Sequence, residues 1–130
     1  MSLSRSMSMS VRALAAAGAI AAATPAAADV TLINVFEVPP GQEEAVIAAW
    51  EKARDFLQGE PGYITTHLHR ALQPDARFAL INIARWESAE AYEAATTRMR
   101  KAGVFPKIEG LAFTPGLYEV IRTDADEGEE

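Results

Sequence analysis

Three side chains near the middle of the sequence could form a polar site in an otherwise apolar setting. Alternation along residues 78–86 puts Asn82 and Trp86 on one face of an expected strand. Ser88 is a good N-cap for the following helix, which carries Tyr92. An amide, an indole and a phenol therefore point toward one space. Because the other strand face is also apolar, the amide of Asn82 needs a hydrogen-bond partner, and this need indicates a site.

Two histidines form a second candidate group. His67 and His69 lie two residues apart in an expected strand, so they share a face and could hold a metal or supply a base. No acid or third histidine stands at an obvious companion position, so we expect no metal site. His67 is a candidate general base, and a surface or dimer-edge position is the alternative for both.

Six expected elements must position these residues. Residue alternation and helical periodicity predict strands over 30–38, 63–71, 78–86 and 117–122, and helices over 42–58 and 89–102. The first strand is apolar on both faces, which favours an interior position, whereas the second favours an edge. Residues 104–115 are expected to be irregular. The order predicts an α+β, ferredoxin-like split βαβ fold, with a four-stranded antiparallel sheet and two helices on one face.

Two helices cover only one face of such a sheet. The first and third strands still offer apolar residues to the uncovered face, namely Ile33, Val35, Ala79, Ile81 and Ile83. A monomer rarely exposes an apolar patch of this kind. We therefore expect a homodimer joined sheet to sheet, in the arrangement of a dimeric α+β barrel.

The two ends of the chain differ from the middle. Residues 1–28 have basic, apolar and small-residue parts typical of a secretory signal peptide cleaved after Ala28. We expect the exported protein, periplasmic or secreted, to consist of a domain over 29–122 and an acidic, disordered tail over 123–130. An Ala-rich leader or a wrongly chosen start codon is the alternative for residues 1–28.

Charge and composition exclude several partners. Removing residues 1–28 removes two arginines and no acid, so the remaining 102 residues carry 10 basic and 18 acidic groups, a net charge of −8. Such a surface repels nucleic acid and anionic membranes. The chain has no cysteine, which excludes disulfides, thiolate nucleophiles and cysteine-based metal sites.

Four stretches together resemble the antibiotic biosynthesis monooxygenase superfamily, whose members have the dimeric α+β barrel fold. They are VTLINVFEVPPGQEEAVIAAWEKA, EPGY, INIARWESAEAYEAA and PGLYEVI. The resemblance spans about residues 30–122. It is more specific for fold than for activity, because the superfamily also contains haem-degrading enzymes and members with no assigned reaction.

Two branches of the superfamily can be compared residue by residue. Asn82, Trp86 and Tyr92 match in type and spacing the residues of the anthrone- and quinol-forming monooxygenases. Asn34 matches a first-strand asparagine of the haem-degrading branch, but the expected axial histidine is missing from residues 104–107. The resemblance therefore implies oxygenation without a cofactor more strongly than haem degradation.

This resemblance implies a substrate and roles for the candidate residues. A small aromatic or polyketide-like phenol or hydroquinone would lose a proton and reduce dioxygen itself. Asn82, Trp86 and Tyr92, with His67 as a possible base, would be catalytic, and Asn34, Phe36 and Leu80 would bind the substrate. The alternatives are a non-catalytic or stress-related protein that binds a hydrophobic ligand, and a haem-related enzyme with a different ligand set.

Overall fold

The computed structural model describes residues 29–124. The predicted signal peptide over 1–28 and residues 125–130 of the predicted acidic tail lie outside the described residues. The elements follow the predicted order: β1 (Val30–Glu37), α2 (Glu43–Leu57), β2 (Tyr63–Arg70), β3 (Leu80–Trp86), α3 (Ala89–Ala102) and β4 (Ala112–Tyr118). No helix among the described residues is long and apolar enough to cross a bilayer.

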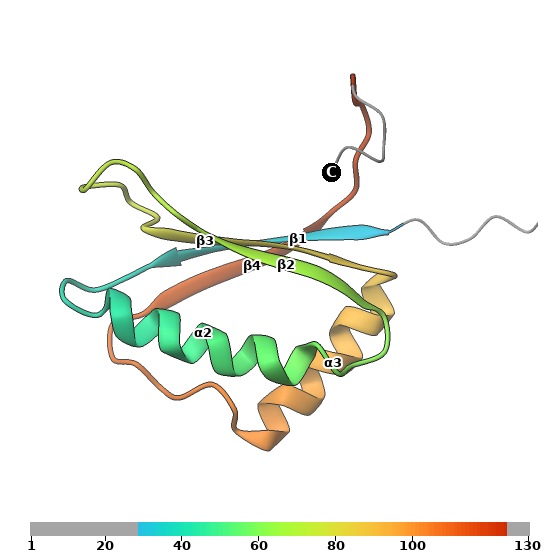
Figure 1. Cartoon of the computed structure of the whole chain (residues 1–130), viewed down its shortest axis with the longest axis horizontal. Helices are drawn as coiled ribbons and strands as arrows, with labels where there is room; N and C mark the ends of the chain where they lie inside the picture. Colours follow the sequence, from blue (N-terminus) through green and yellow to red (C-terminus); the bar gives the residue numbers. More distant parts are fainter. Residues whose placement is uncertain (1–28, 125–130) are drawn as a thin grey trace, which may run out of the picture.

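The four strands form one antiparallel sheet in the order β2-β3-β1-β4. Both helices lie on the same side of this sheet, and the other side carries no helix (Figure 1). The predicted ferredoxin-like α+β architecture is confirmed, as are the interior position of β1 and the edge position of β2.

The helix boundaries follow from local chemistry. The Ser88 hydroxyl accepts a hydrogen bond from the Ala91 backbone N–H at 3.1 Å, which makes Ser88 the predicted N-cap of α3. Gly103 ends α3 in the left-handed conformation at φ 65°, where glycine carries no Cβ penalty. Glu43 and Glu44 occupy the first turn of α2, where the helix dipole favours acids.

The last strand differs from its prediction. We expected it over 117–122, but β4 runs over Ala112–Tyr118. Tyr118 pairs with Thr31, the second residue of β1. The residues that follow Tyr118 therefore extend beyond the first residue of β1, which ends the pairing of the two strands. Pro115, in the middle of β4, hides the strand from sequence patterns, and it is tolerated because β4 is an edge strand.

The core on the helix side consists of two clusters. One contains Leu32, Ala84, Trp86 and Ala95, and the other contains Phe36, Val46 and Leu80. Asn34 lies between Leu32 and Phe36 along β1, and Asn82 lies between Leu80 and Ala84 along β3. The two amides therefore interrupt the apolar face of the sheet at the same level.

The turn before β2 fixes the start of α3 against the sheet. Gly62 has φ +90°, and its carbonyl accepts a hydrogen bond from the Glu87 N–H at 2.8 Å. A Cβ added at Gly62 would lie 2.4 Å from the Ala91 Cβ, far inside van der Waals contact. Only glycine fits here without displacing α3.

We predict that Gly62→Ala lowers the free energy of unfolding by more than about 2 kcal/mol, because steric overlap adds to the cost of positive φ. Gly41→Ala is the matched control, since Gly41 has φ +78° but no atom within 4 Å of the new Cβ. It should lose only about 1–2 kcal/mol. Urea denaturation measures both values, and equal losses in the two variants would contradict the predicted overlap at Gly62.

Candidate active site

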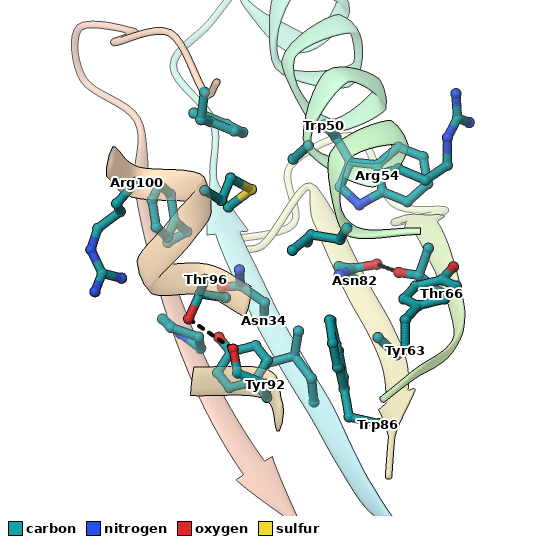
Figure 2. Close-up of a pocket in the computed structure, with 18 of the residues that line it drawn as sticks. Asn34, Trp50, Arg54, Tyr63, Thr66, Asn82, Trp86, Tyr92, Thr96 and Arg100 are labelled. Atoms are coloured by element: carbon teal, nitrogen blue, oxygen red, sulfur yellow. Dashed lines mark hydrogen bonds between the residues drawn. The ribbon is translucent and has the colours of Figure 1, made fainter. Parts of the chain in front are cut away.

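A cavity of about 520 Å³ lies between the inner face of the sheet and the two helices. Figure 2 shows side chains from both helices and from the sheet facing it. Its walls are mainly apolar, and its volume falls in the range typical of small-molecule sites. The polar or charged residues among those that line it are Asn34, Arg54, Tyr63, Thr66, Asn82, Tyr92, Glu93, Thr96, Thr97 and Arg100.

Asn82 is the most buried polar side chain in this cavity. The residue is 9% exposed, and its Oδ1 accepts a hydrogen bond from the Thr66 hydroxyl at 2.7 Å. The sequence indicated that this amide needs a partner but did not identify Thr66. The register of β2 and β3, with Leu68 opposite Asn82 and Thr66 opposite Ala84, brings the two side chains onto one face.

Asn34 stands directly opposite Asn82 in the pairing of β1 with β3. Its Oδ1 is buried and has no hydrogen-bond partner within the described part of the chain. A buried acceptor left unpaired costs about 1–3 kcal/mol. Such exceptions are uncommon in folded proteins, and this one marks the level of the amide pair as a candidate site.

Trp86 forms an aromatic wall of the cavity and is only 1% exposed. Its ring meets Tyr63 edge-on at a centroid distance of 5.5 Å and Tyr92 edge-on at 5.8 Å. These two contacts fix the plane of the indole in a favourable geometry. Trp86 therefore packs in the core and lines the cavity at the same time.

Tyr92 presents a neutral phenol. Burial raises the pKa of Tyr92 above its usual value of 10, and this effect outweighs the opposing influence of Arg100. Glu93 acts in the same direction as burial. A phenol with a raised pKa is protonated at neutral pH, so Tyr92 can donate a hydrogen bond.

The structure brings five of the seven predicted site residues to this cavity: Asn34, Phe36, Asn82, Trp86 and Tyr92. Leu80 is a correction, because it packs in the core with Phe36 and Val46 and does not line the cavity.

His67 is the second correction. A bulge between Tyr63 and Thr65 breaks the alternation of β2, so Tyr63 faces the cavity while His67 pairs with Ile83 on the opposite face of the sheet. His67 therefore cannot act as a base on a group held in the cavity. His69 shares that outer face, opposite Ile81. The described residues contain no group of three or more His, Cys, Asp or Glu side chains able to hold a metal.

Sequence reasoning missed several lining residues. Tyr63 was not among the predicted site residues, and the bulge that separates its face from that of His67 leaves no signal in the sequence. Phe105 and Phe113 lie in the stretch expected to be irregular. The Phe113 ring contacts the rings of Phe36 and Phe105, each at a centroid distance of 5.8 Å, in tilted and edge-on geometry. Only the register of β1 and β4, with Phe36 opposite Phe113, could have indicated this aromatic row.

Known structures share this fold. A proposed monooxygenase from Shewanella loihica PV-4 has 46% sequence identity and a TM-score of 0.68, over 74% of this chain and 97% of that chain. SnoaB, a cofactor-independent oxygenase from Streptomyces nogalater, has 24% identity and a TM-score of 0.59, over 75% and 97%. The haem degrader MhuD from Mycobacterium tuberculosis has 21% identity and a TM-score of 0.55, over 74% and 99%. The last two matches show the fold alone.

Sequence comparison gives the family. No curated protein sequence matches this chain significantly. The family profile described as antibiotic biosynthesis monooxygenase matches residues 29–99, which include β1, β2, β3 and most of α3. With this match and the 46% identity to the Shewanella protein, the chain belongs to the antibiotic biosynthesis monooxygenase family.

Proposed function

We propose that this protein is a cofactor-independent monooxygenase that oxidises an aromatic or polyketide-like phenol or hydroquinone with dioxygen. One observation carries the proposal: a pair of facing amides, Asn34 and the buried Asn82, interrupts an apolar cavity wall beside Trp86 and Tyr92. In such a reaction the ionised substrate supplies the electrons that reduce dioxygen. One oxygen atom enters the product and the other leaves as water.

The lining residues suit this chemistry. Amide donors can hold the negative oxygen of an ionised phenol, and they do so more strongly where water is excluded. The fixed face of Trp86 can stack on a flat ring. The neutral phenol of Tyr92 can donate a hydrogen bond to a reduced oxygen species. These groups provide orientation and charge stabilisation, while the substrate supplies the electrons.

Haem chemistry fits the cavity less well. Haem iron in proteins is held by histidine, cysteine, methionine or tyrosinate. The chain has no cysteine, and both of its histidines lie on the opposite face of the sheet. Met99 lines the cavity, but a methionine ligand serves haem iron beside a histidine, and no histidine reaches this cavity. The raised pKa of Tyr92 disfavours the tyrosinate form that iron would need. We therefore derive no haem-dependent step for this site.

Export is a separate proposal. The apolar leader over residues 1–28 supports a signal peptide cleaved after Ala28. An exported oxygenase would meet its phenol in the periplasm or outside the cell. Biosynthetic tailoring of polyketides normally occurs in the cytoplasm, so an exported protein would act on a compound that has already left its site of synthesis.

We also propose that a second copy of the chain covers the outer face of the sheet. This face carries Ile33, Val35, Ile81 and Ile83, and Ile83 is 36% exposed. At the edge, Tyr118 is 56% exposed, and Val120 and Ile121, which follow β4, are more than 70% exposed. The C-terminal segment leaves the sheet on the side away from the helices (Figure 1). Burial of these side chains against the same surface of a partner would remove an exposed apolar patch.

Oxygen consumption tests the proposed reaction. An oxygen electrode with a panel of anthrones and hydroquinones should record uptake without added flavin or metal. Asn82→Ala should lower kcat/KM by about 100-fold, because it removes one donor to the developing oxyanion. Gln73→Ala is the matched control, since it removes an exposed amide in the connection between β2 and β3, outside the cavity lining. No uptake above background, with ligand binding retained, would instead support a non-catalytic binding protein.

Spectrophotometric titration tests the state of Tyr92. The chain has three tyrosines, and we expect one phenol to ionise clearly above pH 10. Tyr92→Phe should remove this late phase from the near-ultraviolet titration curve. Because the folded-state pKa is raised, the contribution of Tyr92 to stability should be fully present below pH 10 and should be lost as the pH rises through the folded-state pKa, since the unfolded chain ionises first. Loss of an early phase in this variant would contradict the assignment.

Sedimentation tests the association of two copies. The wild-type protein should sediment as a dimer at micromolar concentration, and Ile83→Lys should shift it toward monomer by placing a charge in the apolar interface. Leu72→Lys is the control, because Leu72 is 98% exposed in a turn. A wild-type monomer at this concentration would rule out the proposed dimer.

A further inference from the structure

The hydrogen bond between Thr66 and Asn82 determines what Asn82 can offer a ligand. A side-chain amide has an acceptor oxygen and a donor nitrogen. The Thr66 hydroxyl donates to Asn82 Oδ1 at 2.7 Å. Figure 2 shows this oxygen turned toward Thr66, with the amide nitrogen at the opposite end of the group. Asn82 is therefore left with Nδ2, a donor, for the cavity that it lines.

The neighbouring amide reinforces this polarity. Asn34 faces Asn82 directly across the antiparallel pair, where Cβ atoms lie about 4.5–5.5 Å apart. Because its Oδ1 is buried, Asn34 has its amide N–H groups left as the polar side-chain group that a ligand could reach. Two amide donors can thus approach a single ligand atom from adjacent strands.

The charged residues that line the cavity come from the two helices. Arg54 comes from α2, and Glu93 and Arg100 come from α3, while the lining residues from the strands include no charged side chain. The remaining titratable groups of the lining are the phenols of Tyr63 and Tyr92. Arg54 is paired with Asp55, which does not line the cavity, at 3.0 Å. Arg100 and Glu93 remain as one charge of each sign, so selection of a negative ligand depends on the two amide donors.

We propose that Thr66 is a positioning residue that commits Asn82 to donating, so that the cavity selects an ionised oxygen, a phenolate or enolate, over a neutral hydroxyl. The proposal rests on the proposed function for the aromatic class of ligand. A neutral hydroxyl would need an acceptor to receive its proton, whereas an ionised oxygen accepts from both amides. Without the Thr66 hydroxyl, the Asn82 amide could rotate and present its oxygen, which repels an anion.

A dye that changes colour on ionisation tests this selection directly. The probe is 1,2-dihydroxyanthraquinone, which is already oxidised and whose absorbance spectrum reports the fraction ionised. Bound to the wild-type protein, its first pKa should fall by about one unit from the free value, a tenfold shift of the ionisation equilibrium. Thr66→Val keeps the side-chain shape but removes the hydroxyl, and most of the shift should disappear.

Two variants separate positioning from general damage. Thr66→Ser retains the hydroxyl and should restore the wild-type shift. Thr65→Val makes the same substitution at the adjacent position, where Thr65 pairs with Arg85 on the outer face, and should leave the shift unchanged. If Thr66→Val shifts the dye as far as the wild-type protein does, the proposal is overturned.

A second substitution keeps the proposal testable if Thr66→Val fails to fold. Asn82→Asp retains an oxygen for the Thr66 hydroxyl but replaces the donor nitrogen with a second carboxylate oxygen. This variant should raise the pKa of the bound dye. A lowered pKa in Asn82→Asp, or a wild-type protein that binds the neutral dye more tightly than its anion, would refute selection of an ionised oxygen.

This experiment is separate from the oxygen-uptake assay. An intact dye shift with no oxygen consumption by any substrate would remove the oxygenase proposal and leave the role of Thr66 standing. Oxygen consumption by the wild-type protein, together with an unchanged dye shift in Thr66→Val, would remove the role of Thr66 and leave the oxygenase proposal standing.

Discussion

The antiparallel register of β1 and β3 is the constraint on which the cavity depends. It sets Asn34 opposite Asn82 and places Leu32, Phe36, Ala84 and Trp86 on the same face. Side chains alternate with a period of two along a strand, so a slip of one residue would turn one strand's members of this set to the other face. The apolar neighbours on both sides of each amide strongly favour the observed register, because their burial is lost in the slipped one.

The same register explains why the fold leaves a cavity at this level. The apolar clusters that pack against the helices lie on either side of the amide pair. Trp86, held between Tyr63 and Tyr92, closes one part of the wall, and the Phe36, Phe113 and Phe105 row lines another. The amides would be expensive in a filled apolar core, whereas in a cavity they can meet a polar ligand atom.

Much of this arrangement could be predicted from sequence because it depends on local periodicity. Alternation gave the faces of β1 and β3, and Ser88 and Gly103 marked the ends of α3. Alternation also placed each amide on a face with its apolar neighbours, whereas the direct pairing of Asn34 with Asn82 is set by the register of β1 and β3. Properties that depend on register between distant segments could not be predicted. The bulge in β2 moved Tyr63 to the cavity and His67 away from it, and Thr66 became the partner of Asn82 only through pairing of β2 with β3. The position of β4 is set by its pairing with β1 and is concealed by Pro115.

The central claim is that the amide pair, Trp86 and Tyr92 form a site for a ligand whose oxygen atom is attached to an aromatic ring. A crystal structure of the protein with 1,2-dihydroxyanthraquinone bound tests it most directly. We predict that an ionised phenolic oxygen of the dye lies within hydrogen-bond distance of Asn82 Nδ2 and that its ring system lies against Trp86. An empty cavity with the dye bound on the outer face of the sheet, or a dye whose oxygen atoms avoid both amides, would contradict the claim.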